Sequence, residues 1–128
     1  MKKKLMILVA LIGFGICANA QSPENVARKF CTAVFNKDMV KAKSFMTIED
    51  ARRTPDKMSF SYEEGRMLLS KLNNASFKII KNEYTDKIVT VRYYDSKLEY
   101  LAKNNRWLCC SIELANNNGN WQVTSYGY

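Results

Sequence analysis

Apolar and polar residues recur along this chain with two different periods, which divide it into two parts. Up to residue 74 the apolar side chains recur every three or four positions, the spacing of helices that bury one face. From Ala75 onward they recur at every second position, the spacing of strands with one buried face. The pattern therefore predicts an α+β fold in which N-terminal helices pack on an antiparallel sheet of about four strands.

Three helices are predicted in the first part. The first begins with Ser22 as its N-cap, and the second follows Asp38 after a short break, which favours an antiparallel pair. The third opens with the capping box Ser61–Glu64 and runs to about Asn73. The stretch from 51 to 58, with its two arginines and a Thr-Pro pair, is interpreted as an exposed loop.

The second part predicts two strands, at 77–82 and 89–94, and a C-terminal hairpin from Arg106 to Tyr128. Between them, Ser96–Glu99 resembles another capping box and predicts a short helix, with a continued strand as the alternative. Alternation of side chains then assigns the residues that face the helices, and it turns Glu113 away from them. These inward residues are Val89, Val91, Tyr93, Leu108, Cys110, Ile112, Leu114, Trp121 and Val123.

Residues 1–20 have the features of a signal peptide. A basic start is followed by an apolar run from Leu5 to Cys17 and by the small-residue cleavage site Ala18–Ala20. The sequence therefore predicts export, to the periplasm or outside the cell, and one mature domain over residues 21–128. Lipid attachment at Cys17 is the alternative, and Ile16 disfavours it because a small residue is required there.

The net charge is moderately basic. Loss of the three lysines of the signal segment lowers it from +8 to +5. An exported basic chain indicates anionic envelope polymers or lipids as partners, although a solvated basic surface is the simpler interpretation. Export argues against nucleic acid as a partner, and the apolar run is shorter than a membrane-spanning helix, so no stable membrane insertion is expected after cleavage.

Three segments together resemble a known family. They are Pro23–Met46, Lys87–Val91 and Gly119–Val123, and they span most of the mature chain. Their pattern of apolar and turn positions is similar to that of the small secreted lumazine-binding-like family, within the nuclear-transport-factor-2-like (SnoaL-like, cystatin-like) superfamily. The resemblance implies a curved antiparallel sheet wrapped around helices, often with a conical pocket. The superfamily includes isomerases, dehydratases, toxin-immunity proteins and binding modules, so the resemblance does not transfer a function.

The residue types exclude several chemistries. The chain contains no histidine, so Ser-His-Asp catalysis, Cys-His catalysis and His-ligated metal sites are excluded. No phosphate-binding glycine loop is present, and neither a metal nor a cofactor site is predicted. Cys31, Cys109 and Cys110 are interpreted as buried apolar fillers in a domain large enough to fold without a crosslink. Neighbours in a strand face opposite ways, so at most one of the last two is expected to meet Cys31, and which one stays open.

The remaining candidates suit binding rather than proton transfer. Tyr62, Met67, Tyr93 and Trp121 are the predicted ligand-binding residues, because they offer apolar contact and one or two hydrogen bonds. No catalytic residue is predicted. The expected function is a non-enzymatic binding or interaction module that holds a small apolar ligand or a protein partner, with unknown oligomeric state. The alternatives are an isomerase- or dehydratase-type enzyme and an immunity-like protein inhibitor.

Three structural signs distinguish these functions. An enzyme requires a buried carboxylate within hydrogen-bond reach of a tyrosine inside a solvent-connected pocket. A small-ligand binder requires an apolar pocket of roughly 300 Å³ or more. An interaction protein requires a filled interior and an exposed apolar patch.

Overall fold

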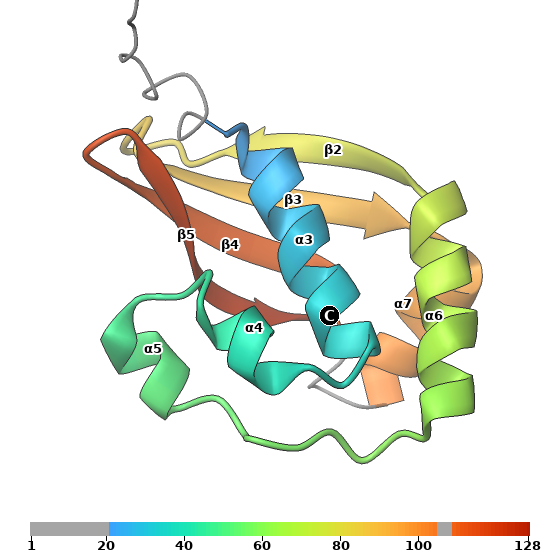
Figure 1. The fold of residues 1–128 in the computed structure, drawn as a ribbon. Coiled ribbons are helices and arrows are strands. Elements are labelled where there is room, and N and C mark those ends of the chain that lie inside the picture. The colour runs from blue at the N-terminus through green and yellow to red at the C-terminus, as the bar shows by residue number, and fades with distance from the viewer. Residues whose placement is uncertain (1–20, 105–108) are drawn as a thin grey trace, which may run out of the picture.

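The computed structural model describes residues 21–104 and 109–128 and has the predicted helices and strands in the predicted order, together with one further short helix at 48–52 (Figure 1). The described residues form five helices and four strands. The helices are α3 (Pro23–Phe35), α4 (Met39–Lys43), α5 (Ile48–Arg52), α6 (Tyr62–Asn74) and α7 (Ser96–Asn104). The strands are β2 (Ser76–Lys81), β3 (Ile88–Tyr94), β4 (Ser111–Asn117) and β5 (Asn120–Gly127).

The four strands form one antiparallel sheet in the order β2-β3-β4-β5, so each strand pairs with the next one along the chain. Helix α3 lies across one face of this sheet and contacts β3, β4 and β5 (Figure 1). Helix α6 packs against α3 and α7 at one end of the sheet, and α4 packs beside α3. The predicted α+β class and the antiparallel sheet are confirmed.

The core fills the space between α3 and the sheet. Alternation along the strands is as predicted. Val91, Ile112 and Leu114 are buried against the helices. Glu113 lies on the other face of the sheet, where it pairs with Thr90 and Ser125 on the neighbouring strands. Leu108 lies outside the described residues. The largest fully buried side chains are Tyr93, Phe30, Phe35, Leu68, Leu72, Leu98, Ile112, Leu114, Val34, Val91, Val123 and Cys31.

An irregularity in the β4–β5 hairpin changes which side chains of β5 enter the core. Leu114 pairs with Val123 and Glu113 pairs with Ser125, so Thr124 is the extra residue of a β-bulge. Thr124 donates its hydroxyl hydrogen to the Glu113 carboxylate at 2.8 Å. Because the bulge shifts the alternation by one residue, the ring of Tyr126 faces inward and packs against Phe30 with ring centroids 5.0 Å apart.

The two edges of the sheet differ. On the β5 edge the Val123 amide donates to the Phe45 carbonyl at 2.8 Å, and Met46 forms a parallel bridge with Val123, so the segment after α4 covers this edge. On the β2 edge all six residues of the strand are exposed. Among the described residues, β2 is therefore the edge with free backbone groups along its length.

The helix starts confirm most of the predicted caps. Ser22 accepts from the Asn25 amide at 3.1 Å, Asp38 caps α4, and Ser61 with Glu64 forms the complete capping box of α6. The predicted capping box at Ser96 is wrong, although the helix itself exists. Asp95 caps α7 instead, because its carboxylate accepts from the backbone amides of residues 97 and 98, at 2.9 and 3.0 Å.

The predicted exposed loop from 51 to 58 is also wrong in part. Residues 51 and 52 belong to α5, and Thr54 and Met58 are 7% and 5% exposed. Thr54 donates to the Asp50 carbonyl, which satisfies its buried hydroxyl. The segment is polar in sequence, and burial of two of its side chains depends on packing against distant parts of the fold. No helix within residues 21–104 and 109–128 is both long and apolar enough to cross a membrane.

Candidate functional site

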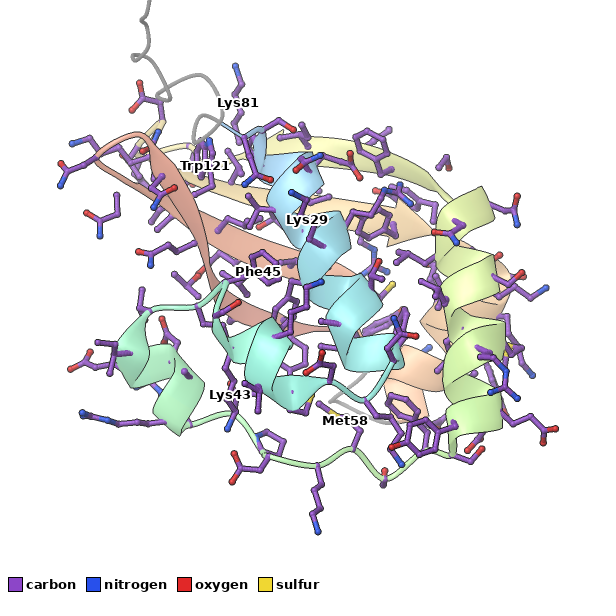
Figure 2. The ribbon with its side chains drawn as sticks, in the orientation of Figure 1. Lys29, Lys43, Phe45, Met58, Lys81 and Trp121 are labelled. Atoms are coloured by element: carbon purple, nitrogen blue, oxygen red, sulfur yellow. The ribbon has the colours of Figure 1, made fainter. Side chains whose placement is uncertain are left out.

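A groove of about 570 Å³ runs between α3 and α4 on the side of α3 that faces away from the sheet. On the α3 side, the groove is lined by residues that are three or four positions apart in the chain and therefore share one helix face. Phe45, just after α4, is half-buried in the same groove (Figure 2). The groove is lined by Asn25, Arg28, Lys29, Thr32, Ala33, Asn36, Asp38, Lys41 and Phe45.

The groove carries more positive than negative charge. Asp38 is its one carboxylate, and its side chain accepts a hydrogen bond from the Lys41 amide as the cap of α4. The Lys29 ammonium donates to the Gln21 side-chain oxygen at 2.7 Å. Within the described residues neither Lys29 nor Lys41 forms an ion pair with a carboxylate. The arrangement therefore offers two ammonium groups beside an apolar surface at Ala33 and Phe45.

A second cluster ties the start of α3 to β3. The Tyr93 hydroxyl donates to Glu24 Oε2 at 3.0 Å, and Arg28 Nε lies 2.8 Å from the same oxygen. The Arg28 guanidinium stacks over the Tyr93 ring, 5.3 Å from its centroid, and also donates to the Leu72 carbonyl near the end of α6. This cluster joins α3, β3 and α6 through three kinds of contact at once.

The electrostatics of this cluster oppose proton transfer. Burial, with Cys31 and Glu24 nearby, raises the pKa of Tyr93 well above its usual value, so the hydroxyl stays protonated as a donor. Glu24 accepts hydrogen bonds from both Tyr93 and Arg28. Neither Glu24 nor Tyr93 lines the α3–α4 groove. The tyrosine–carboxylate pair expected of an enzyme is thus present, but apart from this groove.

The structure disperses the four predicted ligand-binding residues. Tyr62 is 66% exposed at the start of α6, where its ring lies 5.0 Å from the Lys37 ammonium. Met67 is half-buried in the middle of α6, and Tyr93 is fully buried beneath α3. Trp121 is half-buried beside the turn of the β4–β5 hairpin (Figure 2). None of the four lines the α3–α4 groove, and their role in binding stays a prediction.

A smaller hollow of about 380 Å³ lies on the face of the sheet opposite α3. Its lining combines the Glu113 carboxylate with the hydroxyl-bearing side chains of Thr90, Ser111, Ser125 and Tyr128. Among the described residues no group of three potential ligand side chains is placed to hold a metal ion. The lining of this hollow is mainly polar, whereas the α3–α4 groove also offers an apolar wall at Ala33 and Phe45.

Sequence reasoning missed the groove because it placed only one face of α3 against the rest of the fold. That assignment is correct for the helix alone. The hollow arises where α4 turns back beside α3 and brings Lys41 and Phe45 opposite Lys29. A usable signal was present in the short break before Asp38, which predicted the antiparallel helix pair but not the space between its members.

The chain matches no protein-family model, and no curated protein or solved structure is significantly similar to it.

Proposed function

We propose that the protein is an exported, non-enzymatic interaction module of nuclear-transport-factor-2-like architecture, whose partner presents negative charge to the α3–α4 groove. The observation that carries the proposal is the pair of ammonium groups, Lys29 and Lys41, beside the apolar wall of a hollow of about 570 Å³. That volume is in the range of sites for small organic molecules. The resemblance to the lumazine-binding-like family is compatible with this function but does not specify it.

The filled interior supports an interaction module over a binder with an internal pocket. In the architecture that we propose, α3 occupies the cone formed by the curved sheet, and the ring of Phe30 is fully buried there. Tyr126 closes against this ring because of the β-bulge in β5. A ligand therefore finds its space outside the cone, along the polar face of α3.

The contacts around Glu24 support binding over catalysis. A general base has to be free to take a proton from its substrate, and its pKa has to lie near the operating pH. Glu24 instead accepts from Arg28 and Tyr93 at 2.8 and 3.0 Å, so two protein donors already occupy its Oε2 atom. We interpret the cluster as a clamp between α3 and β3, and we assign it no step in a reaction.

The groove favours an organic anion with a short apolar part. Its carboxylate or phosphate would lie between Lys29 and Lys41, and its apolar part would pack on Phe45 and Ala33. The same chemistry describes an acidic side chain of a peptide. Both lysines are exposed, so the attraction is expected to weaken as the ionic strength rises.

The groove predicts that organic anions stabilise the protein. With aliphatic monocarboxylates, dicarboxylates and alkyl phosphates as probes, we expect at least one to raise Tm by about 2 °C or more at saturating concentration. Changing Lys29→Gln and Lys41→Gln together should weaken that binding about tenfold, because about 1.4 kcal/mol of attraction is lost. Titration calorimetry measures the affinity.

The matched control removes two other exposed lysines, with Lys57→Gln and Lys97→Gln. This variant has the same net charge as the groove variant, but neither position lines the groove. Its affinity for the anion should stay within about twofold of the original, because distant exposed charges are screened. Equal loss in both variants, or no Tm response to any probe, would exclude the groove as an anion site.

The β2 edge is a second candidate for interaction. Its side chains Phe77, Ile79 and Ile80 are 42%, 44% and 48% exposed, and its outer backbone groups are unpaired within the described residues. We propose that this edge pairs with β2 of a second copy about a two-fold axis at Ile79. That register places Lys78 opposite Ile80 and Lys81 opposite Phe77, so it brings no lysines directly opposite each other.

This pairing predicts a dimer that depends on Ile79. Sedimentation equilibrium should give a dimer at high protein concentration, and Ile79→Lys should abolish it because two like charges would meet at the axis. Val40→Lys is the control, since Val40 is 87% exposed and lies on α4, away from β2. A monomer for the unmodified protein at every concentration, or dissociation by both substitutions, would reject the β2 pairing.

A further inference from the structure

Two hollows adjoin at strand β5. The larger is the hollow of about 380 Å³ on the face of the sheet opposite α3. The smaller, of about 230 Å³, lies where β5 meets the segment around α5 (Figure 1). Ser125 and Tyr126 line both hollows, so the two are continuous with each other. We call them together the β5 groove.

The β-bulge in β5 shapes the floor of this groove. In a regular strand the side chains of Thr124 and Ser125 would point to opposite faces of the sheet, but Thr124 is the extra residue of the bulge. Its hydroxyl reaches the Glu113 carboxylate, which lies on the same face as Ser125. Two consecutive hydroxyl side chains of β5 therefore line one groove.

The polar groups of the β5 groove retain capacity for further hydrogen bonds. Thr124 donates to Glu113 Oε1 at 2.8 Å, whereas Glu113 Oε2 accepts from no donor among the described residues. The Ser111 oxygen accepts from the Arg92 guanidinium at 2.7 Å, which leaves the Ser111 hydrogen to donate elsewhere. Ser125 forms no side-chain hydrogen bond in the part of the chain that the structure describes. The groove thus offers one carboxylate acceptor beside hydroxyls that can donate.

The charges around the larger hollow disfavour an ionic ligand. Within residues 21–104 and 109–128, neither Glu113 nor Lys103 forms an ion pair. The Lys103 ammonium lies 5.9 Å from the centroid of the Tyr128 ring, and the Arg92 guanidinium lies 4.9 Å from it. An anion would be repelled by Glu113, and a cation would be repelled from the ring. These charges therefore favour a neutral ligand with many hydroxyl groups.

We propose that the β5 groove binds a neutral oligosaccharide. A pyranose ring has an apolar face of C–H groups and a rim of hydroxyls. The larger hollow offers the matching pair, the 53% exposed ring of Tyr128 and the Glu113 carboxylate. Sugar hydroxyls would donate to the carboxylate, and such charge-assisted bonds are stronger than neutral ones. The smaller hollow, with Thr54 and the Asp50–Arg53 ion pair in its lining, would hold a further sugar unit.

The β5 groove is separate from the α3–α4 groove, because the two share no lining residue. They also differ in chemistry, since the α3–α4 groove presents unpaired ammonium groups and favours an anion. Binding of an oligosaccharide therefore does not depend on binding of an anion. Because the ligand is neutral, its affinity should change less than about twofold between low and high ionic strength.

The test is titration calorimetry of the purified protein with neutral hexasaccharides: cellohexaose, laminarihexaose, maltohexaose, mannohexaose, xylohexaose and chitohexaose. We expect at least one of them to bind with a Kd below about 1 mM. Cationic chitosan hexamers and anionic galacturonate hexamers should bind more weakly than the best neutral probe. If no neutral probe binds, or if an ionic hexamer binds as tightly as the best neutral one, the proposal is wrong.

Substitutions in the larger hollow locate the site. Glu113→Gln keeps the size of the side chain but makes the acceptor neutral, so it should weaken binding about tenfold. Its control is Glu83→Gln, with the same change in charge at an exposed position in the turn between β2 and β3. Circular dichroism and Tm show whether each variant is folded.

Tyr128→Ala tests the stacking surface separately and should also weaken binding about tenfold. Its ring is exposed enough that removal is expected to leave the fold intact, and Tyr84→Ala, at an 87% exposed position, is the control. Both controls should bind within about twofold of the unmodified protein. Unchanged affinity in Glu113→Gln or in Tyr128→Ala, or an equal loss in its control, would overturn the assignment of the site.

Discussion

Replacing Gly65 with alanine is expected to destabilise the protein by about 3 kcal/mol or more. Gly65 lies in the fourth position of α6, where this helix crosses the end of α3. A Cβ atom at this position would lie well inside van der Waals contact with the Phe35 carbonyl oxygen and 3.3 Å from the Phe60 ring. Backbone atoms of α3 cannot move aside as a flexible side chain would, so the two helices have to separate.

The sign of this effect distinguishes packing from helix propensity. Alanine is about 1 kcal/mol more favourable than glycine inside a helix, so the sequence by itself predicts a gain. Urea denaturation of Gly65→Ala measures the free energy of unfolding directly. Ser70→Ala, at an exposed position of the same helix, is the control and should change stability by less than about 0.5 kcal/mol. Increased stability in Gly65→Ala would show that α3 and α6 do not approach as described.

Replacing Tyr93 with alanine is expected to cost about 3–5 kcal/mol, the range for large aromatic residues in cores. The side chain is fully buried, and its ring lies 6.1 Å from that of Phe77. Its removal also deprives Arg28 of a stacking surface and Glu24 of a hydrogen-bond donor. The substitution therefore opens a cavity and weakens the contacts that join α3 to β3.

Tyr93→Phe separates the hydroxyl from the ring. It keeps the packing and removes one hydrogen bond to a charged acceptor, so we expect a loss of about 1.5–3 kcal/mol. In a protein that already carries Glu24→Gln, Tyr93→Phe should lower the free energy of unfolding by less, because the acceptor is no longer charged. A double-mutant cycle measures the difference. A loss below about 1 kcal/mol for Tyr93→Ala in urea titration would contradict the burial of this residue.

The local elements of the fold were predictable from the sequence. Periods of three to four and of two residues gave the order of helices and strands, because burial of one face imposes these spacings. Ser61 and Glu64 formed the predicted capping box, since both partners lie within one turn. Glu113 turned outward as predicted, because side chains alternate along any regular strand. Each of these features depends on residues that are close in the chain.

The candidate site was less predictable. Tyr62, Met67, Tyr93 and Trp121 were selected for their chemistry, and the structure places them in four separate environments. The groove beside Lys29 exists because α4 packs against α3, and aromatic or polar character in a sequence does not encode that space. The misassigned cap of α7 has a more local cause, since Asp95 and Ser96 are adjacent and both are good caps.

The sequence by itself determined most of the helical and extended stretches, and which face of each is apolar. Only the tertiary structure decided what covers those faces. It buried Thr54 and Met58 in a polar stretch and left β2 exposed. The physical reason is that periodicity follows from backbone geometry over a few residues. Which element covers a face depends instead on segments that are far apart in the chain. A single bulge or a single glycine changes how closely such segments approach each other.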